Sequence, residues 1–117
     1  MDQPSPDRSV IAESRFDAQT RAAIRPLISP ELIAEHQRDP LANHSDALQR
    51  VQNYLRRSRA ITPYVIVCTQ PFREWRIAKL SGNRGVAPEI LETPVFTSQA
   101  AAMHGLFLKR LDEAFAA

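Results

Sequence analysis

The segment that decides the fold is Thr62–Ser81, which reads TPYVIVCTQPFREWRIAKLS. Its first part, Thr62–Gln70, is β-branched and aromatic, with apolar residues at both odd and even positions, which indicates a strand covered on both faces. Glu74–Ser81 reads as a second strand, and the short PFR stretch between the two suits an antiparallel hairpin. The sequence therefore predicts a small antiparallel sheet in the middle of the chain.

The residues before this hairpin follow a helical pattern in three short pieces. Pro26 ends the first piece, because the residue before a proline resists the helical conformation. Ser29 then caps the second piece, and Pro30 takes its first helical position. The N-terminal residues 1–14 are polar and predict a flexible segment, so that the remaining residues 15–117 form a single domain. The helices are expected over residues 15–24, over 30–39, and from Ser45-Asp46 to a point before Pro63.

The residues after the hairpin predict an edge strand and a long helix. The stretch VAPEILETPVF contains two prolines, which confine any strand there to the edge of a sheet. Thr97 or Ser98 is expected to cap a final helix whose apolar stripe covers the sheet. Gly105 within it costs about 1 kcal/mol relative to alanine, which close packing against another element would explain. The chain is thus expected to be α+β: three short helices, a small antiparallel sheet and a long C-terminal helix packed on it.

The composition is that of an ordinary globular protein. Of its 117 residues, 44% are hydrophobic and 24% charged, and the formal net charge is +2. This charge is too small to indicate nucleic-acid binding by itself. The chain has one cysteine, no signal-peptide pattern and no apolar run long enough to span a membrane, so a cytoplasmic protein is expected.

Candidate catalytic and metal-binding residues do not converge in the sequence. His36 and His44 are separated by Pro40, and His104 is distant, so we expect ordinary histidines rather than metal ligands. Cys68 lies within a predicted strand and is expected to be a buried structural thiol. The sequence therefore predicts no catalytic, cofactor-binding or metal residues in this chain.

Basic residues cluster in LQRVQNYLRRSR, Leu48–Arg59. Leu48, Val51 and Leu55 define one buried face of a helix, with Tyr54 beside them. The arginines on the other faces would suit nucleic-acid binding, together with aromatic side chains for stacking. Arginine and aromatic residues are equally typical of protein–protein interfaces. We favour the interface and keep a stand-alone nucleic-acid-binding or regulatory module, using the Arg50–Arg59 helix, as the alternative.

The chain resembles the small (alpha) subunit family of N,N-dimethylformamidase in four stretches that occur in a fixed order. These stretches are EHQRDP, LQRVQNYLRR, WRIAKL and SQAAAMHGLFLKRLDE. The N-terminal part of the chain, DRSVIAESRFDAQTRAAIRP, and the turn SGNRGVAP depart from the family pattern. The natural amide is therefore left open. The matching features fall on Glu35, His36, Pro40, Leu48–Tyr54, Arg76–Ala78, Ala102–His104, Phe107, Leu108 and Arg110.

The resemblance implies that two subunits form the enzyme and that only one of them is catalytic. A large (beta) subunit would carry a mononuclear iron and hydrolyse N,N-dimethylformamide to dimethylamine and formate. This chain would be its non-catalytic accessory subunit in a hetero-oligomer of αβ units, with no nucleic-acid or membrane partner. The residues that we expect to contact the partner, or to brace such contacts, are Arg50, Tyr54, Arg57, Arg76, His104 and Arg110.

Overall fold

The computed structural model describes residues 7–58 and 61–115 of the chain. Its elements form an α+β fold, as the sequence predicts. None of the helices in these two ranges is long and apolar enough to cross a membrane. In chain order the elements are α1 (Asp7–Ile24), η1 (Arg25–Leu27), α2 (Pro30–Arg38), α3 (Asp46–Arg57), β1 (Tyr64–Gln70), β2 (Glu74–Lys79), β3 (Glu89–Ile90) and α4 (Gln99–Phe115).

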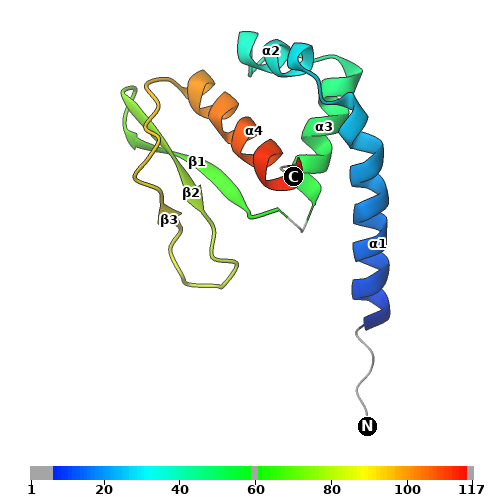
Figure 1. Cartoon of the computed structure of the whole chain (residues 1–117). Helices are drawn as coiled ribbons and strands as arrows, with labels where there is room; N and C mark the ends of the chain where they lie inside the picture. Colours follow the sequence, from blue (N-terminus) through cyan, green and yellow to red (C-terminus); the bar gives the residue numbers. More distant parts are fainter. Residues whose placement is uncertain (1–6, 59–60, 116–117) are drawn as a thin grey trace.

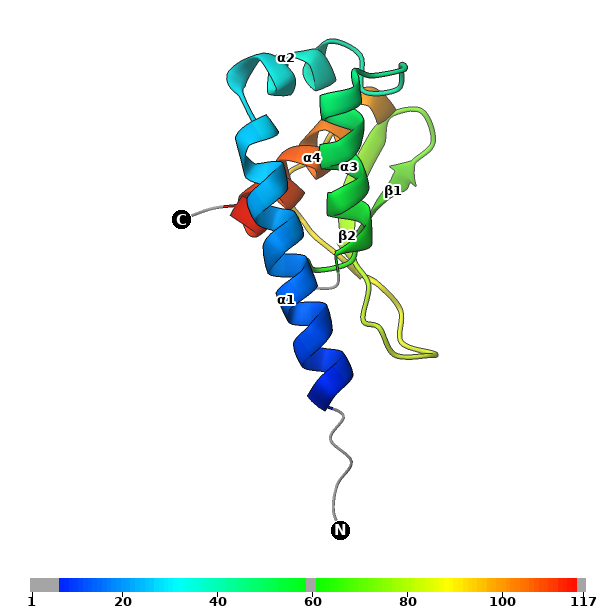
Figure 2. The same cartoon turned by 90° about the vertical axis from the view of Figure 1, so that its right-hand side faces the viewer.

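The C-terminal helix α4 is the central layer of the molecule. It packs on β1 and β2 with one side and on α2 and α3 with the other, so that the sheet and the N-terminal helices lie on opposite sides of it (Figure 1). Leu48 and Val51 of α3 are fully buried in the core that α3 shares with Phe107 and Leu111 of α4. The first turns of α1 extend away from this core (Figure 2).

Helix starts agree with the predicted caps, except at the N-terminus. The hydroxyl oxygens of Ser29, Ser45 and Ser98 each accept a backbone N–H three residues further on. Helix α1, however, begins at Asp7, whereas the sequence predicts the first helix only from residue 15. The prediction relied on the lack of a buried face, but helix formation depends on local propensity as well. Residues 1–6 lie outside the described residues.

The sheet has the order β1-β2-β3 with antiparallel pairing throughout. The ring of Tyr64 lies 5.0 Å below the Lys109 ammonium of α4. Because side chains alternate along a strand, Tyr64 and Ile66 face α4, whereas Val65 and Val67 point to the other face. No described helix besides α4 makes extensive contacts with the sheet. The expectation that the first strand is covered on both faces is therefore wrong for this chain in isolation.

Cys68 is exposed, and the prediction of a buried structural thiol is wrong. Its thiol donates to the carbonyl oxygen of Gln70, 3.3 Å away. The sequence pattern placed it in a strand correctly. The Cys68 side chain is not buried because β1 is an edge strand that a single helix covers. Residues near the hairpin end of β1 therefore remain accessible to solvent.

The β1–β2 hairpin closes with a turn that carries an aromatic residue in an uncommon conformation. The backbone N–H of Arg73 donates to the carbonyl oxygen of Gln70 at 3.0 Å, and Phe72 has φ 61°. With Pro71 at the second position, this is the pattern of a type II turn, whose third position favours glycine or asparagine. Phenylalanine there costs about 1 kcal/mol.

Gly105 of α4 provides room for the ring of Phe96. A Cβ atom built at Gly105 would overlap with this ring. Phe96 is held in place by two backbone hydrogen bonds to Trp75, at 2.8 and 2.9 Å, so it extends the sheet beyond β3. The glycine is thus explained by close packing, as the sequence suggested.

Candidate functional site: a histidine and arginine cluster between the helices

Three histidines, one each from α2, the loop before α3 and α4, lie close together. His36 of α2 is only 2% exposed. Its Nδ1 lies 2.9 Å from Nδ1 of His104 on α4, and its ring stacks on Phe107 at a centroid distance of 4.1 Å. The ring of His44 lies 5.5 Å from that of His36. This cluster connects α2 to α4 and to the loop before α3.

Burial keeps the two bonded histidines neutral. It lowers the pKa of His36 to about 4, and the nearby charges of His104, His44 and Arg56 lower it further in the same direction. Burial also lowers the pKa of His104. In the Nδ1–Nδ1 hydrogen bond, one ring donates its N–H and the other accepts through its lone pair. Protonation of both rings would remove the acceptor and place two positive charges in contact.

The loop between α2 and α3 is fixed by side-chain hydrogen bonds. The Glu35 carboxylate accepts from the backbone N–H of Ser45 at 2.7 Å and from its hydroxyl at 2.8 Å. These two bonds lower the pKa of Glu35. His44 Nε2 donates to the carbonyl oxygen of Asp39 at 2.8 Å. His36 and His44 therefore occupy defined positions despite the proline between them.

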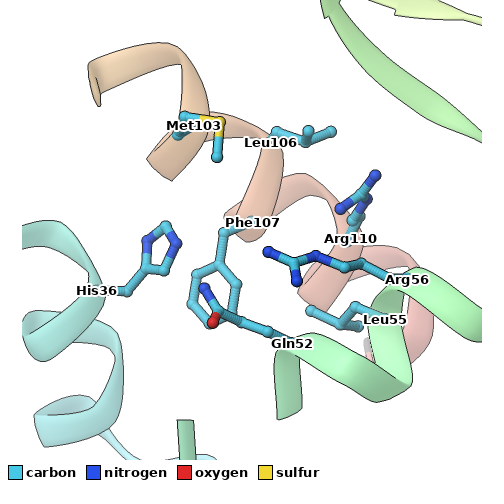
Figure 3. A pocket seen from close by; sticks show the side chains of 8 residues that line it. All are labelled: His36, Gln52, Leu55, Arg56, Met103, Leu106, Phe107 and Arg110. Carbon is cyan, nitrogen blue, oxygen red and sulfur yellow. The ribbon is translucent and has the colours of Figure 1, made fainter. Parts of the chain in front are cut away.

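A small hollow opens beside this cluster, between α3 and α4. Figure 3 shows His36 next to Phe107, with the guanidinium groups of Arg56 and Arg110 on the far side. The hollow has a volume of about 30 Å³, room for little more than a water molecule. It is much smaller than a typical small-molecule site. Its lining residues are His36, Gln52, Leu55, Arg56, Met103, Leu106, Phe107 and Arg110.

The two arginines give the hollow a positive character. Arg110 donates to the carbonyl oxygen of Tyr64 at 3.0 Å. Burial, and then the charge of Arg56, lowers the pKa of Arg110. Neither arginine forms an ion pair with the described part of the chain. Two guanidinium groups at the mouth of a shallow hollow suit a carboxylate from outside the chain.

The residues predicted for a partner interface do not form one cluster. His104 and Arg110 lie on α4 beside the hollow. Tyr54 is buried and donates to the Asp17 carboxylate at 3.2 Å, which leaves it unavailable for base stacking. Arg76, on the sheet, donates to Glu74 at 3.1 Å and to the carbonyl oxygen of Glu92 at 3.2 Å.

The other two predicted residues lie on the outer surface of α3. Arg50 pairs with Asp46 at 3.0 Å, and both side chains are largely exposed. Arg57 is exposed as well. Arg59, the last arginine of the basic stretch, lies outside the described residues. Of the predicted residues, Arg50 and Arg57 are therefore exposed on α3, whereas Tyr54 is buried and His104 and Arg110 lie beside the hollow.

The sequence patterns indicate neither the meeting of the histidines nor the position of Gln52 and Arg56 at the hollow. One signal was present: His36 follows the buried Leu32 by four residues, so both lie on the inner face of α2. The distances to His44 and His104 depend on how α2 packs on α4, which periodicity does not reveal. Within the two described ranges no group of three or more histidine, cysteine or acidic residues is arranged to hold a metal ion.

Comparisons with known proteins identify the family. The profile of the N,N-dimethylformamidase alpha subunit matches residues 11–117. The alpha subunit from Paracoccus aminophilus is 37% identical over 113 residues, which cover 92% of this chain and 79% of that protein. The alpha subunit from an Alcaligenes species is 31% identical over 112 residues, covering 92% of this chain and 83% of that protein. The chain therefore belongs to the N,N-dimethylformamidase alpha subunit family.

Proposed function

We propose that this chain is the non-catalytic small subunit of an iron-dependent amide hydrolase, which cleaves N,N-dimethylformamide to dimethylamine and formate. The active site and a mononuclear iron would lie on a larger partner subunit, with the αβ pairs assembling in the cytoplasm. Family membership is the observation that carries this proposal, since an alpha subunit implies at least one further kind of subunit.

The chemistry of the described side chains supports a role outside catalysis. The paired histidines are occupied with each other, and the serines at helix starts accept backbone N–H groups. Cys68 donates its thiol hydrogen to a backbone carbonyl and has no histidine base close to it in the sheet. Nucleophilic catalysis needs a nucleophile and a base within hydrogen-bonding distance. The described donor set does not fit a resident iron either, because no three histidine, cysteine or acidic side chains in it are arranged to hold a metal ion.

Co-expression with the large subunit tests this proposal. We expect the two chains to copurify, the complex to contain iron and to release dimethylamine from N,N-dimethylformamide, and the isolated small chain to do neither. A large subunit that is fully active without this chain, or hydrolysis by this chain alone, would contradict the proposal. RNA or DNA binding that weakens steeply with added salt would favour the nucleic-acid alternative instead.

The exposed arginines of α3 are proposed as partner contacts. Arginine binds carboxylates with a planar pair of N–H groups, which lysine does not reproduce. We therefore expect Arg57→Glu to weaken copurification with the large subunit more than Arg57→Lys does. Both variants should keep the stability of the isolated chain, because Arg57 is exposed. Equal retention of the partner by both variants would remove Arg57 from the interface.

A further inference from the structure

The tip of the β1–β2 hairpin presents an aromatic ring to solvent. Phe72 is 91% exposed, more than any other large apolar residue whose exposure the structure describes. It occupies the third position of its turn with φ 61°, where glycine or asparagine is the favoured residue. The isolated chain thus combines an unfavourable backbone conformation with an unburied ring, and neither is explained by contacts within the described residues.

Beyond the polar residues Thr69, Glu74 and Arg76 at the hairpin end, the outer face of the sheet is apolar. Val65 and Val67 of β1 point away from α4, and Ala78 of β2 pairs with Val65 and with Ile90 of β3, so these side chains share one face. Ile90 is 49% exposed, Val65 and Val67 are half-buried, and Ala78 is fully buried. Sheets that face water usually carry polar residues on that side. A partly exposed apolar face on the same hairpin as an exposed phenylalanine is typical of a surface that a protein partner covers.

The charges around the tip restrict the kind of partner. Arg76 on the same face is neutralised by Glu74, whose carboxylate also accepts from Thr69. Arg73, adjacent to Phe72, is exposed and makes no ion pair within residues 15–58 and 61–115. A phosphate backbone would need several free cations in a row, whereas the described residues of this surface offer one. A phenyl ring beside a single guanidinium fits an apolar pocket with a carboxylate at its rim.

We propose that Phe72 anchors this chain to the catalytic subunit by entering an apolar pocket there, with Arg73 bound to a carboxylate at the rim. This inference rests on the proposed function and deepens it by naming the docking surface. Interfaces concentrate their binding energy in a few aromatic and arginine residues, and a stable one buries about 800 Å² on each partner. The apolar part of the sheet's outer face would supply some of that area.

The position of the tip allows such docking. In Figures 1 and 2 the turn between β1 and β2 lies at the end of the molecule opposite the free end of α1. It is therefore accessible to a partner without rearrangement of the helices. Covering this surface would also complete the two-sided burial that the apolar pattern of β1 indicates.

The test compares Phe72→Gly with Phe72→Trp in the complex of full-length chains. Glycine removes the ring and relieves the turn, so the isolated variant should melt at the same temperature as wild type or higher. Its dissociation constant for the large subunit should nevertheless rise at least about 30-fold. Tryptophan keeps an aromatic ring and should bind within about tenfold of wild type. A Phe72→Gly variant that keeps its melting temperature but loses affinity for the large subunit would show that Phe72 acts in binding. Loss of stability would instead indicate a structural role.

Two further variants complete the experiment. Arg73→Glu should weaken binding at least about tenfold, and Leu41→Ala, which removes another exposed apolar side chain, should leave binding unchanged. Wild-type affinity of Phe72→Gly, or an equal loss in Leu41→Ala, would overturn the assignment of the anchor while the proposed function stands. Failure of the wild-type chains to associate would overturn the proposed function together with it.

Discussion

The Nδ1 atoms of His36 and His104 lie 2.9 Å apart and connect α2 to α4. This bond exists only while at least one of the two rings is neutral. The stacking of His36 on Phe107 places the same pair at the border of the hydrophobic core. The packing of α2 is therefore linked to the protonation of these histidines.

Acidification is expected to destabilise the chain in the range where free histidine titrates. The pKa of His36 is about 4 in the folded chain, against an ordinary value of 6.5. The unfolded chain therefore binds the extra proton first, and the free energy of unfolding falls as the pH drops below 6.5. We expect a loss of about 2 kcal/mol between pH 7.5 and pH 5. Urea unfolding at a series of pH values measures it.

The matched variant for this experiment is His36→Gln, which cannot titrate. It should be less stable at pH 7.5, because it loses the stacking on Phe107, but its stability should change less between pH 7.5 and pH 5. The carboxylates with lowered pKa, Glu35 and Glu74, lose their contribution only at lower pH. An equally steep profile in the variant would show that other groups cause the effect.

Substitution of Gly105 by alanine is expected to destabilise the chain, although alanine is the better helix former by about 1 kcal/mol. The added methyl group would overlap with the ring of Phe96, and overpacking of this kind typically costs about 1–3 kcal/mol. Thermal unfolding of Gly105→Ala measures the net effect. The double variant with Phe96→Leu should recover part of the loss. A more stable Gly105→Ala variant would mean that the ring moves aside freely.

The Tyr54 hydroxyl is expected to stabilise the attachment of α1 to α3. It donates to one oxygen of the Asp17 carboxylate at 3.2 Å, while Ser58 donates to the other at 2.8 Å. Tyr54→Phe should cost about 1 kcal/mol of unfolding free energy. Tyr64→Phe is the control, because the Tyr64 hydroxyl forms no hydrogen bond with the described part of the chain. Equal effects of the two substitutions would contradict a specific role for Asp17.

The Cys68 thiol is expected to react in the folded chain. It is exposed and is the only cysteine of the sequence, so a thiol reagent such as Ellman's reagent reports on this site alone. We expect complete reaction without denaturant, at a rate within about tenfold of that of the unfolded chain. Protection by several orders of magnitude would mean that the thiol is buried after all.

Local signals account for most of the fold. Ser29, Ser45 and Ser98 begin helices because a serine hydroxyl satisfies a free N–H of the first turn, and this chemistry acts within four residues. The two strands follow from β-branched and aromatic residues on both sides of a short turn. The start of α1 was placed too late, because its first residues form a helix without an apolar face that a periodicity search would detect.

The candidate site was less predictable, because it depends on contacts between distant segments. His36 and His104 are 68 residues apart, and nothing in their local patterns indicates that they meet. The exposure of Cys68 likewise depends on how far α4 covers β1. Tyr54 was placed at the edge of the apolar face, but its hydrogen bond to Asp17 depends on the packing of α1.

The sequence by itself determined the order of the elements, their caps, the apolar faces of α3 and α4, and the ordered motifs of the family, because each of these is encoded by neighbouring residues. Only the tertiary structure decided which histidines pair, which arginines border the hollow, and which face of the sheet the chain leaves uncovered. These features arise where packed helices and strands bring remote residues within a few ångströms of each other, and packing of that kind is a property of the whole chain.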